Sequence, residues 1–470
     1  MTAALWTFEE LADAAKGKFT APAQGEITGL SIDTRTLKNG EAFVALKGDR
    51  FDGHDFVAAA FKAGASFAIV REDKLSSLPQ GNYLIVDDVE EAVRRLARVR
   101  RAQSKAKIVA VTGSVGKTGT KEMLRLALSK SGVTHASVAS FNNHWGVPLS
   151  LARMPRDAEF AIFEIGMNHS GEITPLVAMV KPHVAIVTTV AAVHLEFFKN
   201  VEEIAEAKAE IFSGLEKGGV ALINIDNDYA PILLKRAEEH GAKIVRFGEK
   251  PEAEARLLQA VLKPSQSHLA ASIFGTEIAY KVGVPGRHIA QNSLAVLAAC
   301  SLMGADLALA ALSLADIKAN RGRGARIELE LGDAGSFLLI DESYNANPTS
   351  MRAALALLGD AKPNHGGRRI AVLGDMLELG EQGAPLHAGL SDAVLGAKVD
   401  RAYLVGPLMG TLWQSLPIDL RGAYAHQSAE IEQPLIEAIR PGDVVMVKGS
   451  LGSKMGPVVE SLIARFGKPA

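Results

Sequence analysis

The sequence predicts an α/β protein of three domains, and three observations lead to this fold class. The chain has 470 residues, about three times the size of a usual domain. From residue 107 onward, short apolar runs typical of strands alternate with helical segments, which is the pattern of a parallel sheet with crossover helices. Near residue 315 this alternation starts again, so we place the domains at residues 1–100, 101–315 and 316–470.

The first domain is predicted from two short apolar runs, "EAFVAL" and "FAIV", with the helical "FVAAAFKAGA" between them. The segment "VEEAVRRLARVRRAQSKAK" follows and is predicted to form a helix and a linker. Its many charges are typical of a solvated helix face, and we prefer that interpretation to a binding patch.

Five buried strands are expected in the second domain and four in the third. Those of the second domain are "KIVAVT", "FAIFEIG", "HVAIVTTV", "VALINI" and "KIVRFG". Those of the third are "FLLIDE", "RIAVLGD", "RAYLVG" and "DVVMVKGS", with helical stretches such as "SMRAALALL" and "QPLIEAI" between them. Ligands bind beyond the carboxyl ends of the strands in open parallel sheets, where Gly and Asp residues stand in this chain.

Composition excludes several classes of protein. Hydrophobic residues make up 48% of the chain and charged residues 22%, an ordinary globular balance. The net charge of -2 gives no reason to expect a nucleic acid, whose phosphates require a basic surface. Cys300 is the only cysteine, so no internal disulfide forms, which agrees with a reducing cytoplasm. We expect neither a secretion signal nor a membrane span, and therefore a cytoplasmic protein.

The stretch "VAVTGSVGKTGTKEML" places a glycine-rich turn between a strand and a helix. It matches the phosphate-loop pattern G-x-x-x-x-G-K-[ST] except at the first glycine, where Val111 stands. The turn itself consists of Gly113, Ser114, Val115, Gly116, Lys117 and Thr118. Its glycines let N–H groups face inward, the helix N-terminus attracts anions, and the lysine and threonine serve phosphates and Mg²⁺. We therefore expect a nucleotide site here rather than an ordinary glycine-rich turn.

Three residues beyond this loop are candidates for supporting a cation. Glu164 ends the next predicted strand, His194 follows another, and Lys208 lies on a predicted helix. Taken singly, each has an ordinary interpretation: a solvated carboxylate, a packed or capping histidine, and a surface ion-pair partner. These residues alone leave both interpretations open.

A longer series of strings resembles the Mur ligase family over nearly the whole chain. In order, the strings are T-G-S-x-G-K-T, "FNNHWGVPLS", "FEIGMNHSGEI", "AAVHLEFF", "AKAEIF", "PGRH…N", "DESYNANPTSM", "LGDMLELG" and "VKGS". The resemblance implies a small N-terminal α/β substrate domain that holds a UDP group, a central parallel-sheet P-loop ATPase domain and a C-terminal Rossmann-like domain. "YNANP" and "GDMLELG" are similar to the family member that joins D-alanyl-D-alanine to UDP-N-acetylmuramoyl-tripeptide in peptidoglycan synthesis.

The resemblance implies an ATP-dependent amide ligase that works through an acyl phosphate, with Lys117, His194 and Lys208 as catalytic residues. Two Mg²⁺ ions are implied, one at Thr118 and Glu164 and the other at His194 and a carbamylated Lys208. Carbamylation turns the ammonium group into an anion, which explains how a lysine can serve a cation. We expect the protein to act as a monomer.

The remaining residues implied by the resemblance fall into two groups. Further contacts to ATP are expected from Asn292, Arg326, Asp341, Tyr344 and Asn345, with Arg323 near enough in sequence to take the place of Arg326. Contacts to the other substrates are expected from Ser31, Asp33, Thr34, Arg35, Asn142, Asn143, Asn347, Asp375 and Lys448, with His144, Glu378, Gly449 and Ser450 close to them. Of these, residues 341–347 are expected in the loop after the first strand of the third domain, although "YNANP" also suits an ordinary tight turn.

The phosphate loop and the "YNANP" loop lie on separate predicted sheets, yet both are expected at one ATP. We therefore predict that the C-terminal domain rotates about a hinge near residues 315–325. Two other functions stay open: another Mur-type or folylpolyglutamate-type amino acid ligase, and a P-loop phosphotransferase. The N-terminal domain of about 100 residues disfavours the folylpolyglutamate type, which by resemblance starts at the phosphate loop.

Overall fold

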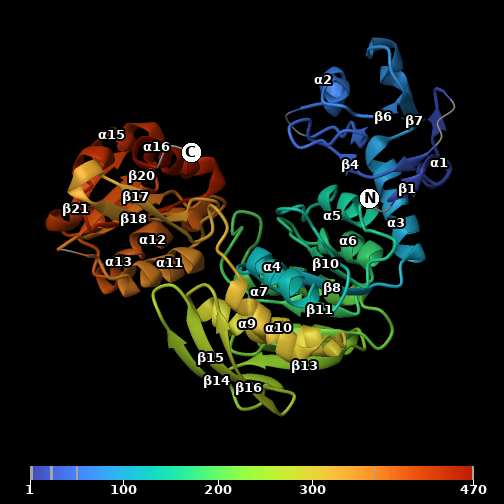
Figure 1. The fold of residues 1–470 in the computed structure, drawn as a ribbon. Helices are drawn as coiled ribbons and strands as arrows, with labels where there is room; N and C mark the ends of the chain where they lie inside the picture. The colour runs from blue at the N-terminus through green and yellow to red at the C-terminus, as the bar shows by residue number, and fades with distance from the viewer. Residues whose placement is uncertain (1–3, 22–24, 49–50, 365, 468–470) are drawn as a thin grey trace.

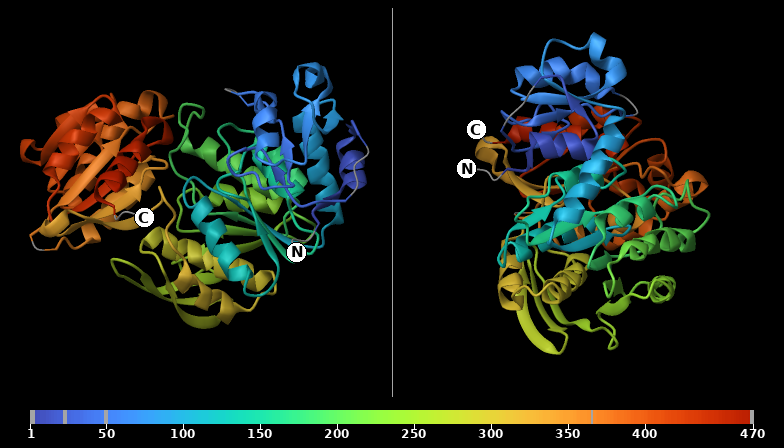
Figure 2. Two further views of the ribbon diagram at one scale, coloured as in Figure 1. Left: turned by 45° about the horizontal axis from the view of Figure 1, so that its top comes forward. Right: turned by 90° about the vertical axis from the view of Figure 1, so that its right-hand side faces the viewer.

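The computed structural model describes residues 4–21, 25–48, 51–364 and 366–467, which form three α/β units (Figure 1). The N-terminal unit, in blue, and the C-terminal unit, in red, lie on different sides of the central unit, as the further views also show (Figure 2). The fold class predicted from the sequence is confirmed. In the described part of the chain, no helix has both the length and the apolar character that crossing a membrane requires.

The N-terminal unit contains a five-stranded sheet of order β2-β7-β6-β5-β4 and a separate pair of strands, β1 and β3. Helix α3 packs against α1 and also against α5 of the central unit, so it joins the two units. The elements are β1 (Trp6–Thr7), α1 (Phe8–Ala15), β2 (Lys18–Phe19), β3 (Glu26–Ile27), β4 (Leu30–Ser31), β5 (Ala42–Val44), α2 (Val57–Lys62), β6 (Phe67–Arg71), β7 (Tyr83–Val86) and α3 (Val89–Gln103), with 3-10 turns at Gly53–Phe56 and Glu72–Ser77.

The central unit is built on a nine-stranded sheet of order β16-β15-β14-β13-β12-β11-β8-β10-β9. The strands run parallel from β9 to β14, and β15 and β16 are antiparallel to their neighbours. The elements are β8 (Lys107–Thr112), α4 (Lys117–Leu128), β9 (Thr134–Ala136), α5 (Gly146–Ala152), β10 (Phe160–Glu164), α6 (Ile173–Val180), β11 (Val184–Val187), α7 (Val201–Ala209), β12 (Val220–Asn224), α8 (Ala230–Glu239), β13 (Lys243–Gly248), β14 (Ala255–Leu262), β15 (Ser267–Ile273), β16 (Thr276–Val282), α9 (Arg287–Leu302) and α10 (Leu307–Ser313), with 3-10 turns at Glu210–Gly214 and Leu314–Asp316.

The position of β8 decides where the site forms. This strand lies between β10 and β11, with Val111 opposite Glu164 and Thr112 opposite Val187. Five of its six residues are buried, because helices cover both faces of a parallel sheet. The strand order reverses at β8, because the strands that follow it in the sequence lie on both sides of it in the sheet. The carboxyl ends of β8, β10 and β11 meet at this reversal, where open α/β sheets bind ligands.

The C-terminal unit has a six-stranded sheet of order β17-β18-β22-β19-β20-β21, parallel except for the pair β17 and β18. The elements are β17 (Ala325–Glu330), β18 (Ser336–Glu342), α11 (Pro348–Asp360), β19 (Arg369–Gly374), α12 (Gly383–Ala388), α13 (Ser391–Gly396), β20 (Arg401–Val405), α14 (Met409–Ser415), β21 (Arg421–Ala425), α15 (Ser428–Ala438), β22 (Val444–Lys448) and α16 (Met455–Phe466), with 3-10 turns at Gly332–Ala334, Gly380–Gln382, Ile418–Leu420 and Leu451–Ser453.

One expectation about this unit was wrong. The run "FLLIDE" forms its second strand, β18, and Asp341 lies inside that strand rather than in the loop after it. The first strand, β17, is an edge strand in which only Leu329 is buried, so it lacks the apolar run by which a strand is recognised. The domain boundaries at residues 100 and 315 stay a prediction; α3 continues past the first, and the linker of residues 317–324 follows the second.

Candidate active site

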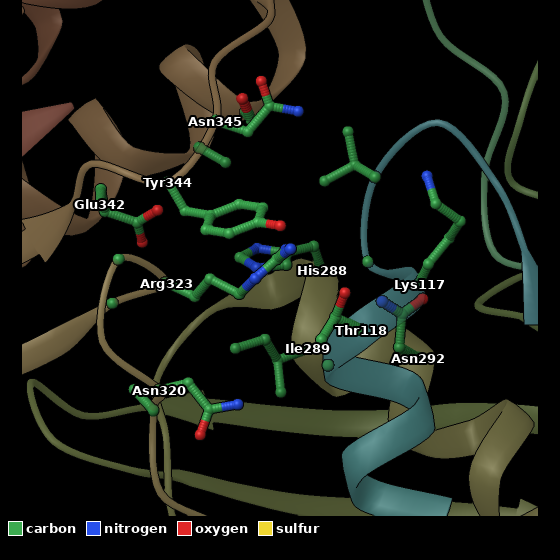
Figure 3. A pocket seen from close by; sticks show the side chains of 18 of the residues that line it. Lys117, Thr118, His288, Ile289, Asn292, Asn320, Arg323, Glu342, Tyr344 and Asn345 are labelled. Carbon is green, nitrogen blue, oxygen red and sulfur yellow. The ribbon is translucent and has the colours of Figure 1, made fainter. Parts of the chain in front are cut away.

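A cavity of about 410 Å³ lies between the central and C-terminal units. Figure 3 shows Tyr344 and Glu342 on one side of it and Lys117 and Thr118 on the other. Many residues predicted for the site line this cavity: Ser114, Val115, Gly116, Lys117, Thr118, Asn142, Glu164, His194, Asn292, Arg326, Tyr344, Asn345, Asn347 and Lys448. The fold therefore brings together residues that are more than 300 positions apart in the sequence.

The phosphate loop depends on two glycines with left-handed backbone angles, Gly113 at φ 147° and Gly116 at φ 91°. A Cβ on Gly113 would lie 2.0 Å from Thr188 Oγ1, so only glycine fits this position. Thr188 Oγ1 also donates a hydrogen bond to the Val115 carbonyl (2.7 Å), and the Ser114 N–H donates to the Thr189 carbonyl (2.8 Å). The loop is thus fixed to the end of β11.

Helix α4 begins directly after this loop and carries Lys117 in its first turn. Among the described residues, no side chain caps its N-terminus, so the first N–H groups remain available to an anion. Lys117 Nζ donates to the Gly113 carbonyl at 2.6 Å. Burial lowers the pKa of Lys117, an effect that Glu164 opposes and Arg323 reinforces. The loop therefore offers a cation and free N–H groups to a phosphate chain.

Glu164 and Thr118 form a pair of oxygen ligands beside the loop. Glu164 is 1% exposed, and its carboxylate accepts hydrogen bonds from Thr118 Oγ1 (2.9 Å) and Asn142 Nδ2 (2.7 Å). In the described ranges, no cluster of three or more His, Cys, Asp or Glu side chains forms a cation cage. A hydroxyl with one carboxylate fits Mg²⁺, which binds few protein ligands and keeps several waters.

Lys208 is 2% exposed, on helix α7. Burial, and then the charge of Lys117, lower its pKa well below the ordinary value of a lysine. Such an environment favours the neutral amine. His194 lines the cavity, and its Nδ1 lies 2.5 Å from Glu378 Oε2 of the C-terminal unit.

The C-terminal side supplies two arginines and an aromatic ring. The Arg323 guanidinium lies 4.1 Å from the centre of the Tyr344 ring, and its Nη2 donates to Ser140 Oγ at 3.1 Å. Arg326 also lines the cavity, and burial lowers its pKa. Both arginines therefore reach the cavity that the phosphate loop also lines.

His288 and Glu342 are among the residues of this cavity that were not predicted from the sequence. His288 lines it at the start of α9, and burial lowers the pKa of its imidazole, with Glu342 opposing and Lys448 adding to the shift. Lys448 Nζ donates to the Asn345 carbonyl (2.9 Å) and lies 3.4 Å from Glu342 Oε2. The strings "PGRH" and "DES" carried these residues, but nothing in the sequence alone placed them in one cavity.

Other predicted site residues do not line the cavity, and their binding roles stay predictions. Asp341 accepts from the Gly322 N–H (2.7 Å) and so braces the linker. Asp375 accepts from the Met409 N–H (2.8 Å) at the start of α14. Asn143 also has a local contact, because its Oδ1 accepts a hydrogen bond from the Gly146 N–H (2.9 Å). The other predicted substrate residues outside the cavity lie in the N-terminal unit: Ser31, Asp33, Thr34 and Arg35. There Arg35 forms an ion pair with Asp33 (2.6 Å).

Lys121 positions the loop that carries Asn142. This lysine of α4 is fully buried, and its Nζ donates to the carbonyls of Ser137 (2.9 Å) and Ala139 (2.6 Å). Ala139 has a left-handed φ of 48°, a strained conformation for a residue with a Cβ. The buried ammonium thus supports the turn that leads to Asn142.

We expect Lys121→Met to lower the free energy of unfolding by about 2–4 kcal/mol, because it leaves two carbonyls without their donor. Chemical denaturation measures this loss. Lys130→Met changes an exposed lysine just after the same helix and should lower stability by less than about 0.5 kcal/mol. Equal effects of the two substitutions would contradict the role of Lys121.

Comparison with known proteins agrees with this architecture. Three family models match successive parts of the chain: "Mur ligase family, catalytic domain" at residues 26–110, "Mur ligase middle domain" at 111–300, and "Mur ligase, glutamate ligase domain" at 325–451. A UDP-N-acetylmuramoyl-tripeptide–D-alanyl-D-alanine ligase of Escherichia coli (strain K12) is 36% identical, over 97% of this chain and 98% of its own. The chain belongs to the Mur ligase family.

Other members of the Mur ligase family are similar over most of their length. The ligase of the same name from Rickettsia prowazekii (strain Madrid E) is 35% identical over 92% of this chain and 94% of its own. A crystal structure of MurF from Acinetobacter baumannii has a TM-score of 0.82 at 30% identity and covers 98% of this chain and 99% of that one. The MurF ligase of Thermotoga maritima in complex with ADP has a TM-score of 0.75 at 26% identity, with 93% and 98% covered.

Proposed function

We propose that this Mur ligase uses ATP to join D-alanyl-D-alanine to UDP-N-acetylmuramoyl-tripeptide, a step of peptidoglycan precursor synthesis. The observation that carries the proposal is that the phosphate loop of one sheet and the "YNANP" loop of another line the same cavity. Relatives with this activity in their names, similar over nearly the whole chain, support the choice of substrates.

The reaction needs activation because a carboxylate has no adequate leaving group. In the first step, a carboxylate oxygen of the tripeptide attacks the γ-phosphorus of ATP, and ADP leaves. The dipeptide amine then attacks the carbonyl carbon of the acyl phosphate and loses a proton. Phosphate departs with the oxygen that came from the carboxylate, and an amide remains. Lys117 and the N–H groups of the loop neutralise the charge that develops on the transferred phosphoryl group.

We propose that two Mg²⁺ ions bind, as the family resemblance implies. Thr118 and Glu164 would hold one, and His194 with a carbamylated Lys208 would support the second. Bound Mg²⁺ supplies positive charge that offsets the repulsion between two anionic reactants. The lowered pKa of Lys208 supports carbamylation, since only a neutral amine adds CO₂. Depleting CO₂ and bicarbonate should therefore lower activity, and a mass increase of the native protein on their return would report the modification.

The assignment of the remaining residues follows the predictions from the sequence. Asn292, Tyr344 and Asn345 would contact ATP, with the carbonyl of Asn345 held by Lys448. The N-terminal unit would hold the uridine diphosphate, and the protein would act as a monomer. The C-terminal unit would rotate about a hinge near residues 315–325, which would exclude water from the acyl phosphate.

The proposed activity is tested by phosphate release with each substrate omitted in turn. Release that requires ATP, UDP-tripeptide and D-alanyl-D-alanine together supports the ligase. Single amino acids in place of the dipeptide should give less than about 1% of this rate, because the dipeptide amine would not be positioned. Turnover without any amine, with a stable phosphorylated product, would instead identify a phosphotransferase.

Arg323→Ala and Arg326→Ala should separate the roles of the two arginines. We expect Arg323→Ala to lower kcat/KM for ATP by about 10²-fold, because its guanidinium lies over the Tyr344 ring in the cavity that the phosphate loop lines. Arg326→Ala should lower it less, by about tenfold. Steady-state kinetics with varied ATP measures both, and the reverse order would assign the main phosphate contact to Arg326.

A further inference from the structure

A second contact joins the central and C-terminal units, away from the linker. It consists of the loop of residues 193–197, after β11, and the loop of residues 376–380, after β19. His194 Nδ1 lies 2.5 Å from Glu378 Oε2, and the Glu196 N–H donates to the Glu378 carbonyl at 3.2 Å. Leu195 packs against the hydrophobic cores of both units. The two loops are therefore docked through side chains and main chain.

The backbone at this contact is strained on both sides. His194 has φ 55° and Glu378 has φ 62°, left-handed values that residues with a Cβ rarely adopt. Gly380 approaches so closely that a Cβ there would lie 3.2 Å from Glu196 Cα. Such strain persists only where surrounding contacts determine the conformation, and it gathers at functional sites. The contact thus aims two particular side chains at each other.

The pair has a defined direction. An ionised carboxylate only accepts hydrogen bonds, and Glu378 Oε2 lies 2.5 Å from Nδ1 of His194. Nδ1 of His194 therefore carries the hydrogen, and the lone pair of a neutral ring is at Nε2. His194 also lines the cavity. A carboxylate on one imidazole nitrogen commonly orients the other toward a metal.

We propose that Glu378 is a positioning residue: from the C-terminal unit, it holds His194 so that Nε2 faces the cation site. Cation binding at His194 then depends on the docking of the C-terminal unit. The metal site is complete only when the two units are arranged so that Glu378 contacts His194. This inference rests on the proposed role of His194 at Mg²⁺.

The test measures Mn²⁺ binding to the full-length protein with a non-hydrolysable ATP analogue, by electron paramagnetic resonance of free Mn²⁺. We expect His194→Ala and Glu378→Ala each to weaken the binding of the second Mn²⁺ by about tenfold or more. Glu378→Gln, which keeps the size of the side chain, should weaken it about threefold. Glu381→Gln, at an exposed glutamate directly after this loop, serves as the matched control and should change nothing.

The double variant decides between positioning and mere docking. If Glu378 acts through His194, then Glu378→Ala in a His194→Ala background causes no further loss of Mn²⁺ affinity. Additive losses, or a Glu378→Ala protein with lower thermal stability but parental Mn²⁺ affinity, would overturn the inference.

Should His194→Ala itself keep parental affinity for Mn²⁺, the magnesium role of His194 in the proposed function fails instead. Circular dichroism of each variant verifies folding, and Glu378→Gln is expected to fold because it retains all its non-charged contacts.

Discussion

Lys117→Ala should lower the rate of amide formation by about 10³-fold, which corresponds to about 4 kcal/mol of transition-state free energy. Lys117 lies in the first turn of α4, where its charge would meet the outer phosphates of ATP. Without it, only Mg²⁺ and the N–H groups of the loop oppose the negative charge on the transferred phosphoryl group. Single-turnover measurement of amide product, with every substrate saturating, gives the rate directly.

The matched control for this substitution is Lys130→Ala, which removes an exposed lysine just after the same helix. It should retain the parental rate within about twofold, since isolated surface charges contribute little. If Lys117→Ala formed amide as fast as Lys130→Ala, the loop would not hold the transferred phosphoryl group. A loss of protein stability alone is excluded by comparing the denaturation curves of both variants.

Gly113→Ala should weaken binding of an ATP analogue by about 100-fold, or about 2.7 kcal/mol. The added Cβ would lie 2.0 Å from Thr188 Oγ1, and alanine at φ 147° is strained even in open space. Thr188 cannot retreat freely, because it also holds the Val115 carbonyl. The loop must therefore change shape, which moves its N–H groups away from the phosphates. Calorimetric titration with the analogue measures the affinity.

Gly396→Ala provides a glycine control far from the loop, since a Cβ there would meet no atom within 4 Å. It should bind the analogue as the parent does. Gly113→Ala should also lower the free energy of unfolding by about 1–3 kcal/mol, as expected for a strained buried position. Parental affinity in Gly113→Ala would contradict the geometry assigned to the phosphate loop.

The sequence predicted those parts of the fold whose signals are local. The strand β8 was recognised because a parallel strand buried on both faces is a continuous apolar run, and the glycine-rich turn after it has a known chemical purpose. Strands β14, β15 and β16 were missed: they form the margin of the central sheet where β15 and β16 run antiparallel, and buried side chains in β15 alternate with partly exposed ones. Such half-polar runs lack the continuous apolar stretch by which the buried strands were recognised.

Residues that line the cavity were predictable where residue type and motif coincide, as at Lys117, Thr118 and Glu164, and their binding roles stay proposals. It was not predictable where the role comes from tertiary contact. Lys121 is not part of the phosphate-loop pattern, yet it is buried and supports the loop of Asn142. The contact between Glu378 and His194 joins residues of different units, so no spacing within the sequence predicts it.

The transfer of phosphate to a carboxylate is tested most directly with UDP-tripeptide labelled with ¹⁸O in its terminal carboxylate. We expect each amide formed to release phosphate that carries one oxygen from that carboxylate, which mass spectrometry of the phosphate detects. Phosphate that contains no ¹⁸O while amide accumulates would contradict the acyl phosphate, and with it the chemistry assigned to this cavity.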